Sequence, residues 1–208
     1  GGAMQADFPL FPLPLVATPH SRTALQIFEP RYLDLIKSSM SAQQCFGLIM
    51  LDAQQPESHT EKTPPPMVSM GTAVRIVDFS QQPNGLLGVV CEGVYKFRAH
   101  DPCMGESGLV VATIEAVAAE DPITLPEQFV ELVTVLQSLL DHDYARSVGY
   151  VTGGDEDYWR NETAQLSWQL ASLMPVPEAV RYRWLEMDDT LARLASILDV
   201  LNQLQDSS

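Results

Sequence analysis

The sequence predicts an α+β protein: a mostly antiparallel β region over residues 4–120, followed by a helical bundle over residues 121–208. Two observations predict this class. Up to about residue 117, short apolar runs and one alternating run are separated by turn residues, which is typical of strands. From residue 121 onward, apolar residues recur at helical spacing. With 46% hydrophobic residues, a chain of 208 residues has enough apolar side chains for a packed core.

Proline dominates the first segment. The apolar run that starts at Phe8 contains Pro9, Pro12, Pro14 and Pro19. Because proline cannot donate a hydrogen bond to a neighbouring strand, we expect an edge strand, a bulged strand or an extended cover there. A second strand is expected over residues 23–28.

A short amphipathic helix should follow that strand. Pro30 suits the first turn of a helix, where its missing N–H is not needed. The apolar residues after it recur at helical spacing; they are Tyr32, Leu33, Ile36 and Met40.

The remaining strands are expected over residues 45–51, 68–79, 86–99 and 109–117. The polar residues 52–67 form a surface loop between the first two. Asn84-Gly85 predicts a type I′ turn, in which both central residues have positive φ. Gly88 and Gly93 are candidate bulge or barrel-corner positions.

The bundle should contain four helices. The first begins at a capping box formed by Thr124 and Glu127 and ends near His142. The others are expected over residues 156–173, 178–187 and 188–205. Trp159, Trp168 and Trp184 are expected in the core or in contacts between the two parts, with a recognition surface as the alternative. Because no Gly/Ser linker joins the two parts, we expect them to unfold as one cooperative unit.

Charge and composition exclude several classes of function. The net charge of −15 and the lack of a basic window argue against nucleic-acid binding. No stretch of 18 apolar residues could span a membrane. Cys45, Cys91 and Cys103 show no C-x-x-C spacing, which is typical of a reduced, cytoplasmic protein. In their apolar runs, Cys45 and Cys91 are interpreted as buried hydrophobic residues.

The sequence lacks the motifs that would indicate ATP hydrolysis or a catalytic metal site. No Gly-Lys-Ser/Thr phosphate loop surrounds Lys37, Lys62 or Lys96, and no lysine follows Lys96. The histidines show no zinc-ligand spacing. Asp141-His142-Asp143 and the acidic residues at 155–157 are interpreted as helix ends rather than metal ligands. We therefore expect no enzymatic activity, no metal site and no cofactor.

Several short motifs, taken in order, resemble one known family. They occupy residues 27–32 (Ile-Phe-Glu-Pro-Arg-Tyr), 46–49, 71–76, 93–97, 173–177, 185–186, 189 and 193–194. Together they resemble the LON domain, the substrate-recognition domain of ATP-dependent Lon proteases. The closest resemblance is to the stand-alone bacterial form without ATPase or protease domains. His20 departs from the pattern, because the family usually has glycine there.

The resemblance implies both a fold and a function. The fold would be a PUA-like open β pseudo-barrel with one inserted helix, packed on the helical bundle. The function would be non-catalytic recognition of polypeptide, as an adaptor in protein quality control, through an exposed apolar patch or a sheet edge. A small-ligand module with an enclosed pocket is the alternative.

The tentative ligand-binding residues are Phe28, Glu29, Arg31 and Tyr32. We interpret Glu29 and Arg31 as an ion pair or cap that holds the strand-to-helix corner, with direct ligand contact as the alternative. Phe28 and Tyr32 are expected to pack between the sheet and the helix. The sequence identifies neither the partner, nor the binding surface, nor the oligomeric state.

Overall fold

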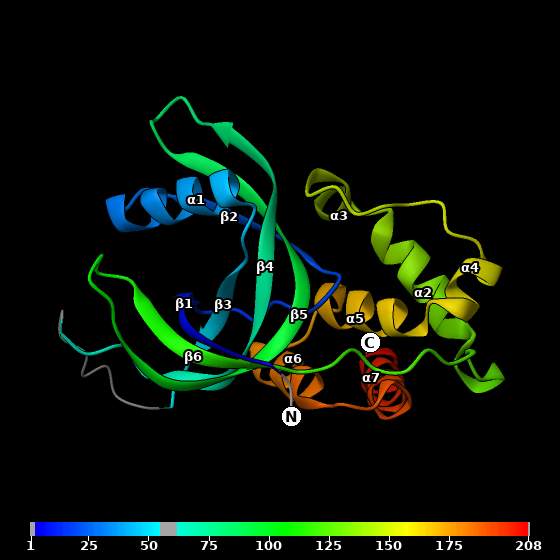
Figure 1. Ribbon diagram of the computed structural model, residues 1–208. Coiled ribbons are helices and arrows are strands. Elements are labelled where there is room, and N and C mark those ends of the chain that lie inside the picture. Colours follow the sequence, from blue (N-terminus) through cyan, green and yellow to red (C-terminus); the bar gives the residue numbers. More distant parts are fainter. Residues whose placement is uncertain (1–2, 55–61, 208) are drawn as a thin grey trace. The chain divides into compact units, whose positions relative to one another are not determined.

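The computed structural model describes residues 3–54 and 62–207, and the chain divides into two compact units, residues 1–118 and 119–208. Among the described residues, unit 1 holds six strands and one helix, and unit 2 is helical (Figure 1). The predicted α+β class is therefore confirmed. Residues 55–61 of the predicted loop lie outside the described residues.

The six strands of unit 1 form one mixed sheet in the order β2-β5-β4-β3-β1-β6, and β5 also pairs with β6. The chain of pairings β5-β4-β3-β1-β6-β5 closes into a pseudo-barrel, with β2 added outside it. The strands are β1 Met4–Leu13, β2 Arg22–Ile27, β3 Phe46–Leu51, β4 Met67–Gln81, β5 Leu87–Met104 and β6 Val110–Ala116. Helix α1, Pro30–Ala42, lies between β2 and β3 in sequence.

The proline-rich strand β1 is a bulged strand, one of the three predicted possibilities. Its register against β6 shifts between Gln5 and Phe8, where Asp7 has φ 54°. It pairs with β6 up to Leu10 and with β3 from Leu10 onward. In this register most of β1 therefore has a strand partner on only one side, which leaves room for residues without a backbone donor.

The hairpin between β4 and β5 differs from the predicted type I′ turn. Gly85 has φ 82°, but Asn84 has no positive φ. The Gly85 N–H donates to the Gln82 carbonyl, and the Asn84 side chain accepts from the Leu86 N–H. This is the pattern of a three-residue loop, in which a type I turn is followed by a left-handed glycine.

The two candidate glycines of β5 play different roles. At Gly93 a Cβ would lie 1.9 Å from the Thr18 carbonyl oxygen, and the register against β4 shifts beside it. Gly93 is therefore a close-approach site next to a bulge. The register of Gly88 with β4 and β2 is regular, so the bulge interpretation is wrong for this position.

The described residues of unit 1 form two hydrophobic cores. One fills the barrel and is built around Phe8, Leu10, Phe97 and Ile114. The other packs α1 against the sheet through residues including Leu35, Ile36, Phe46, Val89 and Cys91. The helix begins with Pro30 in its first turn, as predicted. Its buried face uses Leu35 rather than Met40, which is 37% exposed.

Unit 2 contains the short 3-10 helix η1 and six α-helices. They are η1 Glu127–Phe129, α2 Glu131–Leu140, α3 Asp143–Ser147, α4 Glu156–Asn161, α5 Thr163–Leu173, α6 Glu178–Glu186 and α7 Thr190–Asp206. Helix α3 was not predicted, and the helix expected over residues 156–173 is two helices that meet at Glu162. Trp159, Trp168 and Trp184 are all buried.

The predicted capping box does not form. The helical region begins after Pro126, whose ψ of 146° is extended, and no side chain caps it. The Leu125 N–H donates to the Arg160 carbonyl, and the Thr163 hydroxyl donates to the Ile123 carbonyl. These contacts tie residues 123–125, which lie outside any helix, to Arg160 and Thr163. Caps are formed instead by Asp155 at α4 and Asp189 at α7.

Among the described residues, no helix is both long and apolar enough to cross a bilayer.

Candidate functional site

The corner between β2 and α1 is held by contacts that involve three of the four tentative site residues. Arg31 Nε lies 2.9 Å from Glu29 Oε2, and Arg31 Nη1 donates to the Gly108 carbonyl at 2.9 Å. Tyr32 stacks on Phe11 with ring centroids 4.1 Å apart, and burial raises the pKa of its hydroxyl. These contacts connect α1 to β1 and to the turn between β5 and β6.

Phe28 is not part of that packing, so the expectation that it is buried was wrong. Ile27 is 2% exposed, whereas Phe28 is 66% exposed. The physical reason is the two-residue period of a strand: once Ile27 points into the core, the next side chain points away from it. A large aromatic residue is therefore left in solvent at the end of β2. Arg31, with a side chain 40% exposed, is not buried either.

Strand β2 is an edge strand, since it is the first in the sheet order. The Ser21 carbonyl accepts from the Gly93 N–H, so the backbone of residue 21 faces β5. By the alternation of an antiparallel ladder, the N–H and C=O groups of Ala24 and Gln26 face away from β5. Neither residue has a backbone hydrogen-bond partner on this side among the described residues. The edge thus offers two donors and two acceptors.

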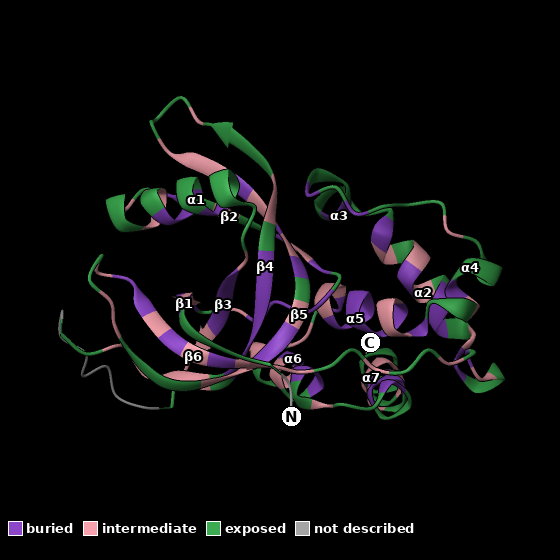
Figure 2. Ribbon diagram, viewed as in Figure 1, coloured by how far each residue is buried: buried purple, intermediate pink, exposed green. Residues whose placement is uncertain are grey.

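A groove of about 350 Å³ lies beside this edge on one face of the sheet. The register places Ala24, Val90 and Asp78 in one row across β2, β5 and β4, and Gln26, Gly88 and Ser80 in the next row on the same face. Because Gly88 has no side chain, the floor of the groove is low there, and the ends of the Ser80 and Gln82 side chains border a narrow hollow above it. Figure 2 shows the end of β4 that borders the groove in the colour of exposed residues.

The groove is lined by one acidic side chain and no basic one. Asp78 Oδ1 accepts from the Phe79 N–H, and no described basic residue forms an ion pair with Asp78. In the neighbouring row, Arg22 and Arg75 both pair with Glu92, at 3.0 and 2.7 Å. Those two arginines are therefore already engaged by another carboxylate.

Other clusters have a structural explanation. Among the described residues, no group of three or more His, Cys, Asp or Glu side chains is placed to hold a metal ion. Asp141 pairs with Arg146, and Asp155 caps α4. Burial raises the pKa of Cys91 to about 12, which makes it a poor nucleophile at neutral pH.

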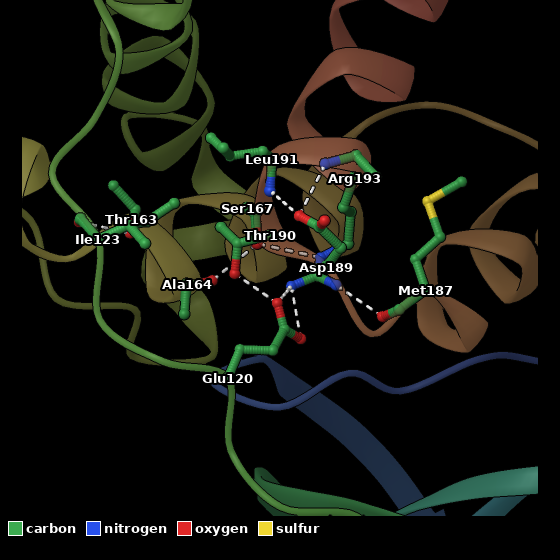
Figure 3. Close-up of polar contacts among 11 residues, drawn as sticks. Glu120, Ile123, Thr163, Ala164, Ser167, Met187, Asp189, Thr190, Leu191 and Arg193 are labelled. Atoms are coloured by element: carbon green, nitrogen blue, oxygen red, sulfur yellow. Dashed lines mark hydrogen bonds and ion pairs between the residues drawn. The ribbon is translucent and has the colours of Figure 1, made fainter.

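A polar network in unit 2 buries two charged side chains, Arg193 and Glu120 (Figure 3). Arg193 Nη2 lies 2.8 and 3.0 Å from the two carboxylate oxygens of Glu120, while its Nε donates to Ser167 and its Nη1 to the Met187 carbonyl. Desolvation lowers the pKa of Arg193, and Glu120 opposes this. Since every hydrogen-bonding nitrogen of the guanidinium is used, the network holds structure rather than a ligand.

Sequence reasoning identified the corner but missed the groove. Ala24, Gln26 and Asp78 carry no motif, and their importance follows from strand order. The exposure of Phe28 could have been found from the alternation in β2, because Thr23, Leu25 and Ile27 form the inward series.

The comparisons with known proteins agree with this architecture. The family model of the ATP-dependent protease La (LON) substrate-binding domain matches residues 7–203. A Lon N-terminal domain protein from Xanthomonas campestris is 28% identical with a TM-score of 0.72, covering 94% of this chain and 98% of that one. The N-terminal domain of a Mycobacterium avium complex Lon protease, 14% identical, shares the fold with a TM-score of 0.59, covering 93% and 96%. No curated protein matches. The chain belongs to the LON substrate-binding domain family.

Proposed function

We propose that this chain is a non-catalytic module that binds extended polypeptide along the free edge of β2. Its family is described as a substrate-binding domain, which supports a protein substrate. The observation that carries the proposal is the unpaired backbone of Ala24 and Gln26 next to the exposed Phe28. We propose further that it acts in the cytoplasm as an adaptor in protein quality control.

The physical mechanism is the addition of a strand. A peptide paired with β2 would form hydrogen bonds with the backbone groups of Ala24 and Gln26, whatever its sequence. Unfolded chains offer such backbone groups, whereas folded proteins have already used most of theirs. Phe28 would add apolar contact area for one peptide side chain. This combination favours unfolded segments without demanding one motif.

The decisive variant is Gln26→Pro. Proline is tolerated on an edge strand where its N–H would face solvent, so the fold should survive. The substitution removes one donor and places a ring where the peptide would lie. We expect at least a tenfold loss of affinity, roughly the effect of one or two hydrogen bonds. Gln26→Ala is the matched control, because it keeps the backbone donor.

Binding can be measured by fluorescence anisotropy with labelled, reduced and carboxymethylated α-lactalbumin, and folding by thermal melting. Equal affinity of Gln26→Pro and Gln26→Ala, with both folded, would contradict binding at the β2 edge. ATP turnover or peptide cleavage that co-elutes with the purified chain would contradict the non-catalytic part of the proposal.

A small-molecule function is the second candidate, because about 350 Å³ is within the range of ligand sites. It makes a different forecast. A ligand held in the groove would respond equally to Gln26→Pro and Gln26→Ala, since both variants remove the Gln26 side chain from the groove and the ligand needs no backbone donor at the outer side of β2.

A further inference from the structure

We propose that the groove over Gly88 receives a lysine or arginine side chain of the polypeptide bound at the β2 edge. This inference rests on the proposed function and adds a chemical preference to it: extended segments with a basic residue at one position would be bound more tightly than their neutral counterparts.

The first step is geometric. Gln26 and Gly88 are paired residues on neighbouring strands, so they share a face of the sheet. A peptide strand added to β2 would lie about 10 Å from β5, since strands are spaced by about 4.8 Å. Side chains of a strand stand roughly perpendicular to the sheet, so only a long peptide side chain opposite Gln26 can bend over Gln26 and reach the space above Gly88. Lysine and arginine combine a long aliphatic stem with a charged end and suit this reach.

The second step is the shape of the hollow. A Cβ on Gly88 would lie 3.2 Å from Ser80 Oγ and 3.1 Å from Gln82 Nε2. A peptide side chain lying over Gly88 would therefore contact the polar ends of Ser80 and Gln82. Gln82 Nε2 donates to Ser80 Oγ, which leaves the Gln82 amide oxygen as an acceptor at the groove. Ala24 and Val90 provide an apolar surface for the stem.

The third step is charge. Asp78 lines the groove and has no basic side chain paired with it among the described residues, whereas the neighbouring Arg22 and Arg75 share Glu92. A cationic guest would supply the missing counter-charge. The net charge of −15 for the whole chain acts in the same direction. An acidic guest would be repelled, and an apolar guest would leave Asp78 without a partner.

The test uses three labelled peptides of the same alternating sequence, differing at one position that is lysine, norleucine or glutamate. Against the full chain, we expect the lysine peptide to bind roughly fivefold tighter than the norleucine peptide at low salt, as for a partly exposed ion pair. The glutamate peptide should bind most weakly. The preference for lysine should shrink as salt rises, because exposed charges are screened.

Asp78→Asn is the decisive variant, and it keeps the size of the side chain. It should reduce the lysine preference to less than twofold, because it weakens the lysine peptide and not the norleucine peptide. Gly88→Ala, which narrows the hollow, should weaken the lysine peptide more than the norleucine peptide. Thermal melting verifies that both variants are folded.

The outcomes separate the two proposals. If all peptides bind, Gln26→Pro abolishes binding, and Asp78→Asn retains the lysine preference, the basic-residue inference is overturned and binding at the edge stands. If wild type shows no lysine preference, the inference is overturned as well. If no peptide binds, both proposals fall.

Discussion

Arg193 in the last helix holds Glu120, 73 residues earlier, through hydrogen bonds to both carboxylate oxygens. The Arg193 side chain is fully buried, the Glu120 side chain is 12% exposed, and the guanidinium carbon lies 3.4 Å from the centre of the Trp168 ring. The Glu120 carboxylate also accepts from the Thr190 hydroxyl. The first residues of unit 2 are thereby fixed to its last helix.

Glu120→Gln should destabilise the protein strongly. The substitution leaves the Arg193 charge buried without its counter-ion, which typically costs ~3–5 kcal/mol. Arg193→Met combined with Glu120→Gln should cost less than the sum of the two single changes, because no unpaired charge remains. Urea unfolding of the four proteins measures this coupling. The exposed pair Arg160 and Glu127 is the control, and Glu127→Gln should leave the unfolding midpoint almost unchanged.

We expect the full chain to unfold in one cooperative transition. Val117 N–H donates to the Lys96 carbonyl in unit 1, and Glu120 is bonded within unit 2, so very few residues separate the two. Calorimetry should give equal calorimetric and van't Hoff enthalpies. Two resolved transitions, of which only the one assigned to unit 2 shifts in Glu120→Gln, would show that the units unfold separately.

Phe28→Ala should leave stability nearly unchanged and weaken the capture of unfolded polypeptide. A side chain that is 66% exposed contributes little to the core, so a change within about 0.5 kcal/mol is expected. Ile27→Ala is the matched control: Ile27 is buried, and its truncation should cost ~2–5 kcal/mol. Thermal melting and anisotropy on both variants decide the matter. A large loss of stability in Phe28→Ala would assign Phe28 to the scaffold instead.

Gly93→Ala should be among the most damaging single substitutions in unit 1. A methyl group there would lie 1.9 Å from a backbone oxygen of Thr18, and backbone cannot move aside as a flexible side chain can. We expect a loss of at least ~3 kcal/mol, beyond ordinary overpacking. Gly88→Ala meets only side-chain ends at its closest contacts and should stay within about 1 kcal/mol of wild type. Comparable melting temperatures for the two variants would contradict this.

Cys91 should make the folded protein less stable as the pH rises above 9. Its pKa is raised from 9.0 to about 12 by burial, so above pH 9 the unfolded chain loses the thiol proton and the folded chain keeps it. Stability is therefore unaffected below pH 9 and falls as pH rises toward 12, by up to about 1.4 kcal/mol per pH unit. The free energy of unfolding of Cys91→Ala, measured by urea titration between pH 8 and 11, should fall less steeply with pH than that of the wild type. Equal slopes of unfolding free energy against pH for the two proteins would show that Cys91 is not the cause of the alkaline loss of stability.

Local features of the sequence were sufficient for most elements. Pro30 marks the start of α1 because its ring favours the first turn of any helix. The alternation in residues 68–79 indicates β4 because strands have a period of two. The left-handed turn at His20, with φ 63°, shows where local reasoning ends: the position suits glycine, yet histidine occupies it and donates its N–H to the Gly93 carbonyl. Thr124 and Glu127 match a capping box, but Ile123 and Leu125 are hydrogen-bonded to Thr163 and Arg160, and the helical region begins only after Pro126.

The sequence by itself determined the fold class, the order of the elements and the family resemblance, because these depend on periodicity and on local backbone preferences. The tertiary structure alone decided which strand has a free edge, that Asp78 lies beside the hollow at Gly88, and that Glu120 meets Arg193. These facts depend on strand order, register and helix packing, which bring together residues that are far apart in the chain. A free backbone donor or an unpaired carboxylate is defined by its neighbours in space, and no local pattern contains them.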